Sequence, residues 1–307
     1  MTQDPTPRPA ARYRTLIAIG AIVLLAVSAV VGASASRSGS SSSPQSDSPA
    51  SGTSPTVDST TTPGTPSAGG PGSTTTFGMI APGRPLPSDE HCGTLVKDAS
   101  DGDQETVPAN IPFNHVRGGQ QLPPDFFAPG SGDPREDREI AARVTGNFTG
   151  TTDQVLRWAA CKWGIDERYV RAQAKVESSW RQTKRGDWTS DASRCAPGHE
   201  LGADGRAGQC PESFGVLQVR YAYFPGAFPA AINSTAFNID TAYAVWRACY
   251  EGYEWWLRDV QASGQAYAAG SVWGCIGRWY SGEWFDQAAQ EYSACVQQVV
   301  AGRSPCR

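Results

Sequence analysis

The sequence predicts a mainly α-helical domain, and three observations support this prediction. Apolar residues recur at helical spacing, between helix caps, in several stretches after residue 147. Eight cysteines in a chain with only three histidines indicate a fold held by disulfides. Prolines interrupt the preceding segment, and no alternating strand pattern replaces the helical one there. The helical part is therefore expected in the second half of the chain.

The first 35 residues have the pattern of a secretory leader. Three arginines precede an uncharged apolar run over residues 16–31, and an A-x-A sequence follows it at residues 33–35. The run is slightly long for a signal peptide and shorter than the roughly 20 residues that span a bilayer. Residues 1–35 are therefore expected to be a signal peptide or a membrane anchor through residues 16–31. In both cases the rest is extracellular, secreted or held at the outer face of the cytoplasmic membrane in the cell wall.

Residues 36–85 are expected to form a disordered linker. Up to Thr76 they are almost entirely Ser, Thr, Pro and Gly, with no aromatic residue. Such a segment cannot bury enough apolar surface to offset its chain entropy. A flexible tether of this kind suits a domain that works in a thick cell wall.

The charge of the chain argues against one class of partner. Residues 1–85 hold five Arg and three Asp, which leaves 21 basic and 27 acidic side chains in residues 86–307 and a net charge of -6 there. Binding to nucleic acid requires clustered Lys and Arg that displace counterions from the phosphates. No nucleic-acid partner is therefore expected.

The even cysteine count predicts four disulfides and an oxidising compartment. With so few histidines, neither a metal centre nor another cofactor is expected. A bridge between Cys195 and Cys210 is favoured, because both lie in one long polar loop, and the sequence leaves the other pairings open. The cysteines expected in bridges are Cys92, Cys161, Cys195, Cys210, Cys249, Cys275, Cys295 and Cys306.

Residues 86–150 are expected to form an extended arm that lies on the main body. Six prolines between Pro108 and Pro134 break any helical pattern. Cys92 is expected to fasten this arm to the domain through a disulfide.

The helical domain is expected over residues 151–307 and begins with a well-capped helix. Thr151 and Gln154 have the spacing of a capping box, and Gly164 ends the helix that follows. Asp166 then caps a second helix.

Two further long helices are expected nearer the C-terminus. One begins at about residue 238 or 240 and runs past Trp246 toward Trp256. The other begins at about Trp284 and places Tyr292 on an apolar stripe.

A single acid, Glu177, lies near the end of the second helix, which is expected over residues 167–180. Its neighbours in the sequence are mostly apolar or small. Burial raises the pKa of a carboxylic acid, which then stays protonated near neutral pH as a general acid must. The alternative is an ordinary exposed glutamate on a helix, which the spacing alone favours.

Two short motifs give this acid a context. Residues 176–180 (VESSW) and 213–219 (SFGVLQV) resemble the paired signatures of the lytic transglycosylase (SLT) and goose-type lysozyme superfamily, a Glu-Ser pair at a helix end followed by a Gly-Leu-Met-Gln segment. The third motif of that family, Ala-Tyr-Asn-x-Gly, is matched loosely by residues 279–284, where Tyr280 keeps the aromatic hydroxyl. The resemblance covers residues 151–284, less than half of the chain.

The resemblance implies a lysozyme-like helical fold whose cleft binds peptidoglycan glycan strands. Glu177 would protonate the bond between N-acetylmuramic acid (MurNAc) and N-acetylglucosamine (GlcNAc), and then accept the proton of the sugar's 6-hydroxyl. The product would be a 1,6-anhydro sugar, so the implied enzyme is a lytic transglycosylase, a lyase. A second acid in the cleft would favour hydrolysis instead. The candidates for that acid are Asp187, Asp191, Glu200, Asp204 and Glu212.

The resemblance also implies substrate-binding residues around the acid. Gln218 is expected to bond an N-acetyl group or the main chain, and Gly215 to let the backbone approach the sugar. Tyr280 is expected to hold Glu177 or the substrate, with a core tyrosine as the alternative. Ser178 is a further candidate, with a bond to a helix carbonyl as the alternative.

Most of the ten tryptophans are expected in the core, where large aromatic side chains usually lie. Trp188 and Trp279 are the two expected in the cleft. Trp188 lies in a polar loop near the acid, and Trp279 precedes Tyr280.

A non-catalytic cell-wall-binding protein with the same body is the alternative function. It would explain the linker, the disulfides and the weak third motif equally well. It would give no reason for an acid at Glu177 beside Gly215 and Gln218, so an enzyme, acting as a monomer, is preferred.

Overall fold

The structure is a computed structural model of the chain, and it describes residues 76–100, 102–127, 130, 132–259 and 264–306. The chain divides into two units, Met1–Ala68 and Gly69–Arg307, and every described residue belongs to the second. The expected leader or anchor and the linker up to residue 75 lie outside the described residues. The prediction of a disordered linker is wrong for its last ten residues, because Phe77 is buried and the Ile80 N–H donates to the Gly164 carbonyl at 2.9 Å.

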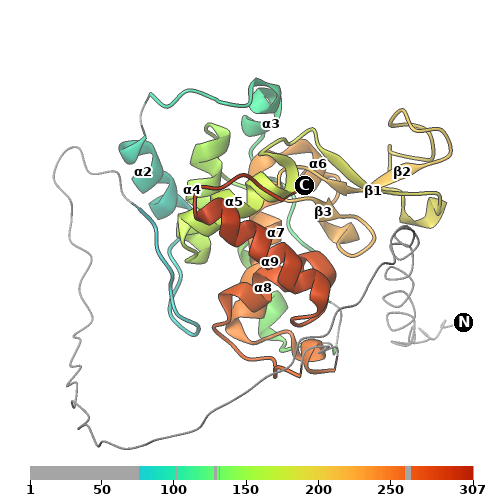
Figure 1. Ribbon diagram of the computed structural model, residues 1–307. Coiled ribbons are helices and arrows are strands. Elements are labelled where there is room, and N and C mark those ends of the chain that lie inside the picture. The colour runs from blue at the N-terminus through green and yellow to red at the C-terminus, as the bar shows by residue number, and fades with distance from the viewer. Residues whose placement is uncertain (1–75, 101, 128–129, 131, 260–263, 307) are drawn as a thin grey trace, which may run out of the picture. The chain divides into compact units, whose positions relative to one another are not determined.

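The described part is mainly α-helical, as the sequence predicts, and contains one small sheet (Figure 1). Short 3-10 and π-helical turns connect several of the longer elements. The helices are α2 (Asp89–Ala99), α3 (Ile111–Asn114), α4 (Thr152–Trp163), α5 (Glu167–Ser178), α6 (Ala230–Asn233), α7 (Thr235–Glu251), α8 (Val272–Ser281) and α9 (Gln287–Val300), and the strands are β1 (Arg185–Thr189), β2 (Cys210–Phe214) and β3 (Val219–Arg220).

Helices α4 and α5 begin where the sequence predicts. The Thr151 hydroxyl accepts a bond from the Gln154 N–H, and the Gln154 side chain accepts one from the Thr151 N–H, which confirms the capping box. Gly164 ends α4 with a φ of +60°, where a side chain would be strained and would meet Ile80. Asp166 caps α5.

Helix α7 forms the centre of the domain. All of its residues from Thr235 to Tyr250 are buried, and it packs against α4 and α8. Helix α9 packs against both α5 and α8 (Figure 1). This arrangement brings the C-terminal helix against a helix that lies more than 100 residues earlier in the chain.

The predicted bounds of the two C-terminal helices need correction. Ser234 caps α7 a few residues before the predicted start, and the helix ends at Gly252, short of Trp256. Asp286 caps α9, so Trp284 lies before that helix and packs in the core. In each case a local capping residue, and not the apolar stripe, determines where the helix begins or ends.

The first strand of the sheet lies in the segment that the sequence predicts as a long polar loop, and the other two strands follow that segment. Strands β1 and β2 are antiparallel, with Arg185 opposite Phe214 and Thr189 opposite Cys210. Strand β3 extends the sheet on the other side of β2. The predicted Cys195–Cys210 disulfide is confirmed, and it closes the loop between β1 and β2.

The prediction that residues 86–150 form only an extended arm is wrong at its start. Ser88 caps the 11-residue helix α2, whose first turn is acidic. The prolines that suggested an extended arm all follow this helix. Cys92 of α2 is bonded to Cys161 of α4, so its predicted role in fastening this segment is confirmed.

All eight cysteines are paired, and four disulfides hold the domain. Cys249–Cys275 joins α7 to α8, and Cys295–Cys306 joins α9 to the C-terminal segment. Within the described ranges, no helix has the length and hydropathy needed to cross a membrane. The same residues contain no group of three acidic, His or Cys side chains that could hold a metal.

Two buried side-chain amides hold the turn between β2 and β3 against the helices. The Asn238 amide of α7 donates to two main-chain carbonyls at 2.9 Å each and accepts from the Leu217 N–H at 3.0 Å. The Gln182 amide accepts from the Val216 N–H at 3.2 Å and donates to two carbonyls of α6. Gly215 has a φ of +82°, and a Cβ there would lie 2.3 Å from the Asn238 nitrogen. The turn therefore requires both amides and this glycine.

The substitution Asn238→Ala tests this dependence. It removes three hydrogen bonds of buried main-chain groups, of which the Ala231 carbonyl keeps the Gln182 amide as a donor, so we expect the free energy of unfolding to fall by about 2 kcal/mol or more. Urea denaturation monitored by circular dichroism measures the change. The matched control is Asn233→Ala at an exposed position, for which we expect a change within about 0.5 kcal/mol. Equal effects of the two substitutions would contradict the structural role of Asn238.

Candidate active site

Glu177 is the last residue but one of α5. The helix ends directly after it because Ser179 and Trp180 both have left-handed backbone, with φ values of +54° and +67°. The residue keeps part of its surface exposed, yet burial of its carboxyl raises the pKa to about 8. Glu177 is therefore protonated at neutral pH.

Three side chains from later in the chain surround this carboxyl. The Tyr292 hydroxyl of α9 donates to Oε1 of Glu177, and the Trp279 side chain of α8 also hydrogen-bonds the carboxyl. Both bonds stabilise the carboxylate and so limit the rise in the pKa. Asp187 of β1 acts in the opposite direction, because its negative charge raises the pKa of Glu177 further.

A network of buried polar side chains holds the Tyr292 hydroxyl in position. The Tyr243 hydroxyl of α7 lies 3.2 Å from the Val170 carbonyl oxygen and 3.3 Å from the Gln173 side-chain oxygen. The Gln173 side chain bonds the Tyr292 hydroxyl in turn. Burial raises the pKa of both tyrosines well above the usual value, so each hydroxyl keeps its proton. Helices α5, α7 and α9 therefore all contribute to the position of the donor to Glu177.

The turn over residues 215–218 lies beside the end of α5. The Ser178 side chain is buried, and its hydroxyl donates to the Val216 carbonyl at 2.8 Å. The Gln218 amide donates to the Gly215 carbonyl at 2.8 Å, and its oxygen lies against Gly186. Ser178 and Gly215 therefore support the site from within the protein, while Gln218 is part-exposed at its edge.

Of the five acids proposed from the sequence as a second carboxylate, Asp187 is the one whose charge acts on Glu177. Asp187 is exposed, and the Ser213 hydroxyl donates to it. The others have local partners in the hairpin. Glu212 forms ion pairs with Arg194 and Arg220, and Asp204 pairs with His199. Asp191 caps a 3-10 turn, and the Glu200 carboxylate accepts a hydrogen bond from the Gly198 N–H.

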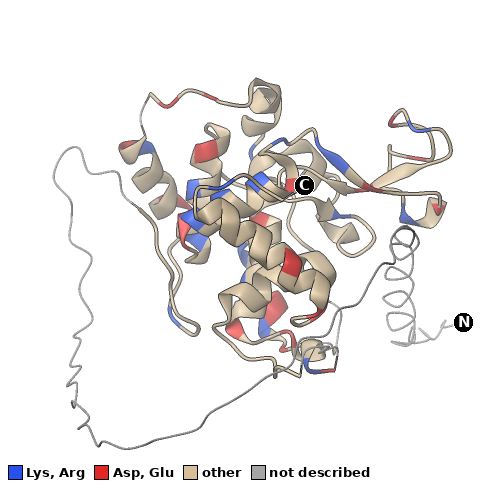
Figure 2. Ribbon diagram, in the orientation of Figure 1, with Lys and Arg blue, Asp and Glu red and all other residues tan. Residues whose placement is uncertain are grey.

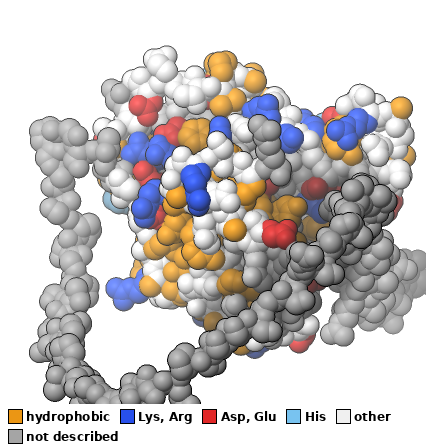
Figure 3. Space-filling view, in the orientation of Figure 1, with side chains coloured by type: hydrophobic (Ala, Val, Ile, Leu, Met, Phe, Trp, Pro, Cys, Tyr) orange, Lys and Arg blue, Asp and Glu red, His pale blue; other side chains and the backbone are white. Residues whose placement is uncertain are grey.

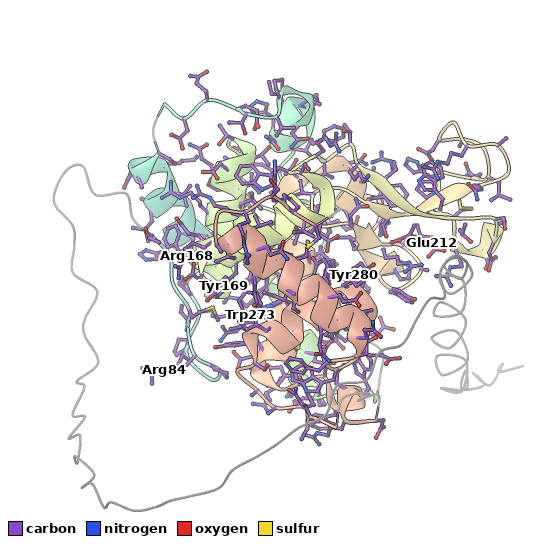
Figure 4. The ribbon with its side chains drawn as sticks, in the orientation of Figure 1. Arg84, Arg168, Tyr169, Glu212, Trp273 and Tyr280 are labelled. Atoms are coloured by element: carbon purple, nitrogen blue, oxygen red, sulfur yellow. A yellow bond between two sulfur atoms is a disulfide. The ribbon has the colours of Figure 1, made fainter. Side chains whose placement is uncertain are left out.

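The structure brings Trp279 to the acid and Tyr280 close to it, but the tyrosine hydroxyl that bonds Glu177 is that of Tyr292 and not, as the sequence suggested, that of Tyr280. Tyr280 is 59% exposed, and its ring stacks on Tyr292 with 4.7 Å between centroids. Trp279 stacks on Phe224 at 6.0 Å. These partly exposed rings form an aromatic wall next to Glu177. Figure 4 places Tyr280 on the side of α9 that faces the β1–β2 hairpin.

Trp188 lies on β1, where the guanidinium of Arg206, from the loop between β1 and β2, covers its ring at 4.2 Å from the ring centroid. This contact holds the loop against the strand, and a place for Trp188 in the cleft stays a prediction.

Sequence reasoning missed Tyr292, Phe224 and Gln173 as parts of the site. In the sequence, Tyr292 is one member of an apolar helical stripe, and its neighbouring residues do not distinguish it from a core tyrosine. Gln173 lies four residues before Glu177, on the same side of α5, and this spacing was the one available signal.

The arrangement provides a proton donor of raised pKa, neutral hydroxyl and indole donors around it, and one nearby carboxylate. A protein-family scan gives no match for the chain, and searches of curated proteins and of solved structures give no significant match either.

Proposed function

We propose that this domain is an exported enzyme that cleaves the MurNAc–GlcNAc bond of peptidoglycan, with Glu177 as general acid and then base. The observation that carries the proposal is the geometry of Glu177, a part-exposed acid at a helix end whose carboxyl accepts hydrogen bonds from Tyr292 and Trp279, where burial also raises its pKa to about 8. The leader sequence and the four disulfides support export.

The proposed reaction begins with proton transfer from Glu177 to the departing glycosidic oxygen. Tyr292 and Trp279 hydrogen-bond the carboxylate that this step leaves behind. The carboxylate then takes the proton of the 6-hydroxyl, whose oxygen closes the 1,6-anhydro ring on the same sugar. One group serves in both steps, so no water enters the reaction.

A lysozyme-like fold is part of this proposal. Its support is the placement of the acid at the end of a helix, next to a small antiparallel sheet and a tight turn after β2. Glycan strands are the proposed partner, and the aromatic wall of Tyr280 and Trp279 offers ring faces for stacking on sugars.

Asp187 supports hydrolysis as a second candidate. Two-carboxylate glycosidases need a second acid to activate water or to attack the sugar. Asp187 is exposed and close enough for its charge to raise the pKa of Glu177. Its Ser213 bond holds the carboxylate in place.

The first test is the turnover of purified peptidoglycan by Glu177→Gln. Glutamine keeps the shape of the side chain but cannot donate the proton, so we expect a loss of about 100- to 10,000-fold in rate. The matched control is Glu90→Gln at an exposed position of α2, which we expect to be as active as the unchanged protein. Normal turnover by Glu177→Gln would contradict the site, and no turnover by the unchanged protein would favour the wall-binding alternative.

Mass analysis of the products separates the two reactions. We expect 1,6-anhydro ends, which are lighter by one water than hydrolysed ends. Because the proposed reaction uses Glu177 alone, we expect Asp187→Asn to retain turnover and to give products of the same mass. Hydrolysed ends together with an inactive Asp187→Asn variant would assign the protein to the hydrolases.

The pH dependence of kcat/KM tests the electrostatics of the site. Activity requires protonated Glu177, so it should fall as the pH rises through about 8. Removing the negative charge in Asp187→Asn lowers the pKa of Glu177 and moves this fall to lower pH. Tyr292→Phe removes a bond that stabilises the carboxylate, so it raises the pKa and moves the fall to higher pH. We expect opposite shifts of about half a pH unit to one unit. Shifts in the same direction would contradict these contacts.

A further inference from the structure

A row of three stacked aromatic rings lies beside the candidate active site. The Trp279 ring of α8 stacks on Phe224, with 6.0 Å between the ring centroids and 5° between the ring planes. Phe224 stacks in turn on Phe126, with 5.6 Å between centroids and 24° between planes. Both separations lie in the range in which offset stacking of aromatic rings is favourable. We call these three residues the ring row.

The ring row controls the plane of the Trp279 indole. An indole N–H lies in the plane of its ring, so a neighbour that stacks parallel to the ring fixes the direction of this donor. The Trp279 side chain hydrogen-bonds the Glu177 carboxyl, and Phe224 is the one ring that stacks on Trp279 within the described residues. Rotation of the indole about its Cβ–Cγ bond would break the stack and turn the N–H away from the acid.

The outermost ring of the row, Phe126, belongs to the segment over residues 120–127, which is fastened to the turn after β3. The Gln120 amide donates to the Gly226 carbonyl at 2.7 Å. A Cβ at Gly226 would lie 2.6 Å from the Pro123 side chain, so the two segments are in close contact. The position of Phe126 is therefore fixed relative to the turn that carries the middle ring.

Phe127 fastens the other end of this segment. Its side chain is buried, and its ring meets the edge of Phe126 at 5.2 Å between centroids. Its N–H donates to the Asp137 carboxylate at 3.0 Å. The segment is thus held at both ends, and it brings a residue from the part of the chain predicted as an arm to within two rings of the acid.

The titratable side chains that interact with the Glu177 carboxyl come from four elements. Asp187 of β1 is the charged group that raises the pKa of Glu177. Tyr292 of α9, Tyr243 of α7 and Tyr280 of α8 also interact with the acid, and burial raises the pKa of all three, so they stay neutral.

The neighbouring helices add little other charge. Arg278 of α8 pairs with Glu254, and Lys175 of α5 is exposed to solvent. Glu291 is the one charged residue of α9, which is otherwise tan in Figure 2. Figure 3 shows hydrophobic side chains gathered over this helix, with Lys and Arg along one edge. A shift in the pKa of Glu177 when the ring row is altered would therefore report on the indole bond and not on a displaced charge.

We infer that Phe224 and Phe126 are positioning residues for the Trp279 donor, so that residues 120–127 form part of the active site. This inference rests on the proposed function, because a fixed donor affects turnover only if Glu177 gives its proton to a substrate. In that reaction the indole N–H bonds the carboxylate that remains, and the ring row keeps the donor aimed at it before the proton leaves.

A titration of Glu177 followed by NMR tests the inference without any catalysis. Glutamate labelled with carbon-13 at the side-chain carboxyl supplies the signals, and the signal that is absent from Glu177→Gln identifies the acid. We expect Phe224→Leu to raise the pKa of Glu177 by about half a unit to one unit, because a loosened indole no longer stabilises the carboxylate. Phe126→Leu acts one ring further away and should raise the pKa by less.

Three comparisons make this titration specific. Phe224→Tyr keeps a stacking ring and should keep the pKa of Glu177. Phe113→Leu is the matched control, because it removes a part-exposed ring of α3 outside the ring row, and it should leave the pKa unchanged. Trp279→Phe has no indole N–H, so Phe224→Leu in that background should cause no further shift.

An unchanged pKa in Phe224→Leu, or the same shift with and without the indole N–H, would overturn the inference. An unchanged pKa in Phe126→Leu would overturn the role of residues 120–127. If Phe224→Leu does not fold, Gln120→Ala provides the test, because it loosens the same segment and leaves all three rings in place. We then expect a rise in the pKa, and an unchanged value would overturn the inference.

Turnover of purified peptidoglycan then distinguishes this inference from the proposed function. We expect Phe224→Leu to lower kcat about tenfold below neutral pH with KM unchanged, because the indole stabilises a charge that appears only as the proton leaves. A rise in KM with unchanged kcat would indicate a contact with the substrate and overturn the positioning role. If the unchanged protein cleaves nothing, the proposed function fails, and the NMR titration still decides whether the ring row positions the donor.

Discussion

The buried amides of Asn238 and Gln182 are the constraint on which the site depends. They satisfy buried main-chain groups in and beside the turn after β2. The Val216 carbonyl of this turn accepts a hydrogen bond from the Ser178 hydroxyl, which fixes the end of α5 against the turn. The direction of the Glu177 side chain is therefore determined by polar bonds in the core as much as by apolar packing.

The helices with complete local signals could be predicted from the sequence. A capping box and Gly164 define α4, and Asp166 defines the start of α5. Helix α2 was missed because the prolines further along the segment suggested an extended chain, although Ser88 and an acidic first turn were present. The sheet was missed because β1 has an exposed Asp187 at its centre and no alternating pattern, and its strands form through pairing across a long loop.

The candidate acid and the two aromatic residues beside it could also be named from the sequence. Their environment could not, because the contacts that change the pKa of Glu177 come from β1, α8 and α9. Trp188 shows the limit of reasoning from proximity along the chain. It is 11 residues from the acid, yet its ring contacts Arg206, which the hairpin brings back over β1 from 18 residues further along the chain.

The bond between Tyr292 and Glu177 joins residues 115 positions apart. A chain that crosses a membrane from its N-terminus delivers Glu177 long before α9, so the acid at first has neither its hydrogen-bond donor nor its covering helix. Without that cover the carboxyl is solvated and ionised at neutral pH, and it cannot serve as a proton donor. In the proposed exported enzyme, the order of the sequence would therefore delay activity until α9 has followed Glu177 across the membrane.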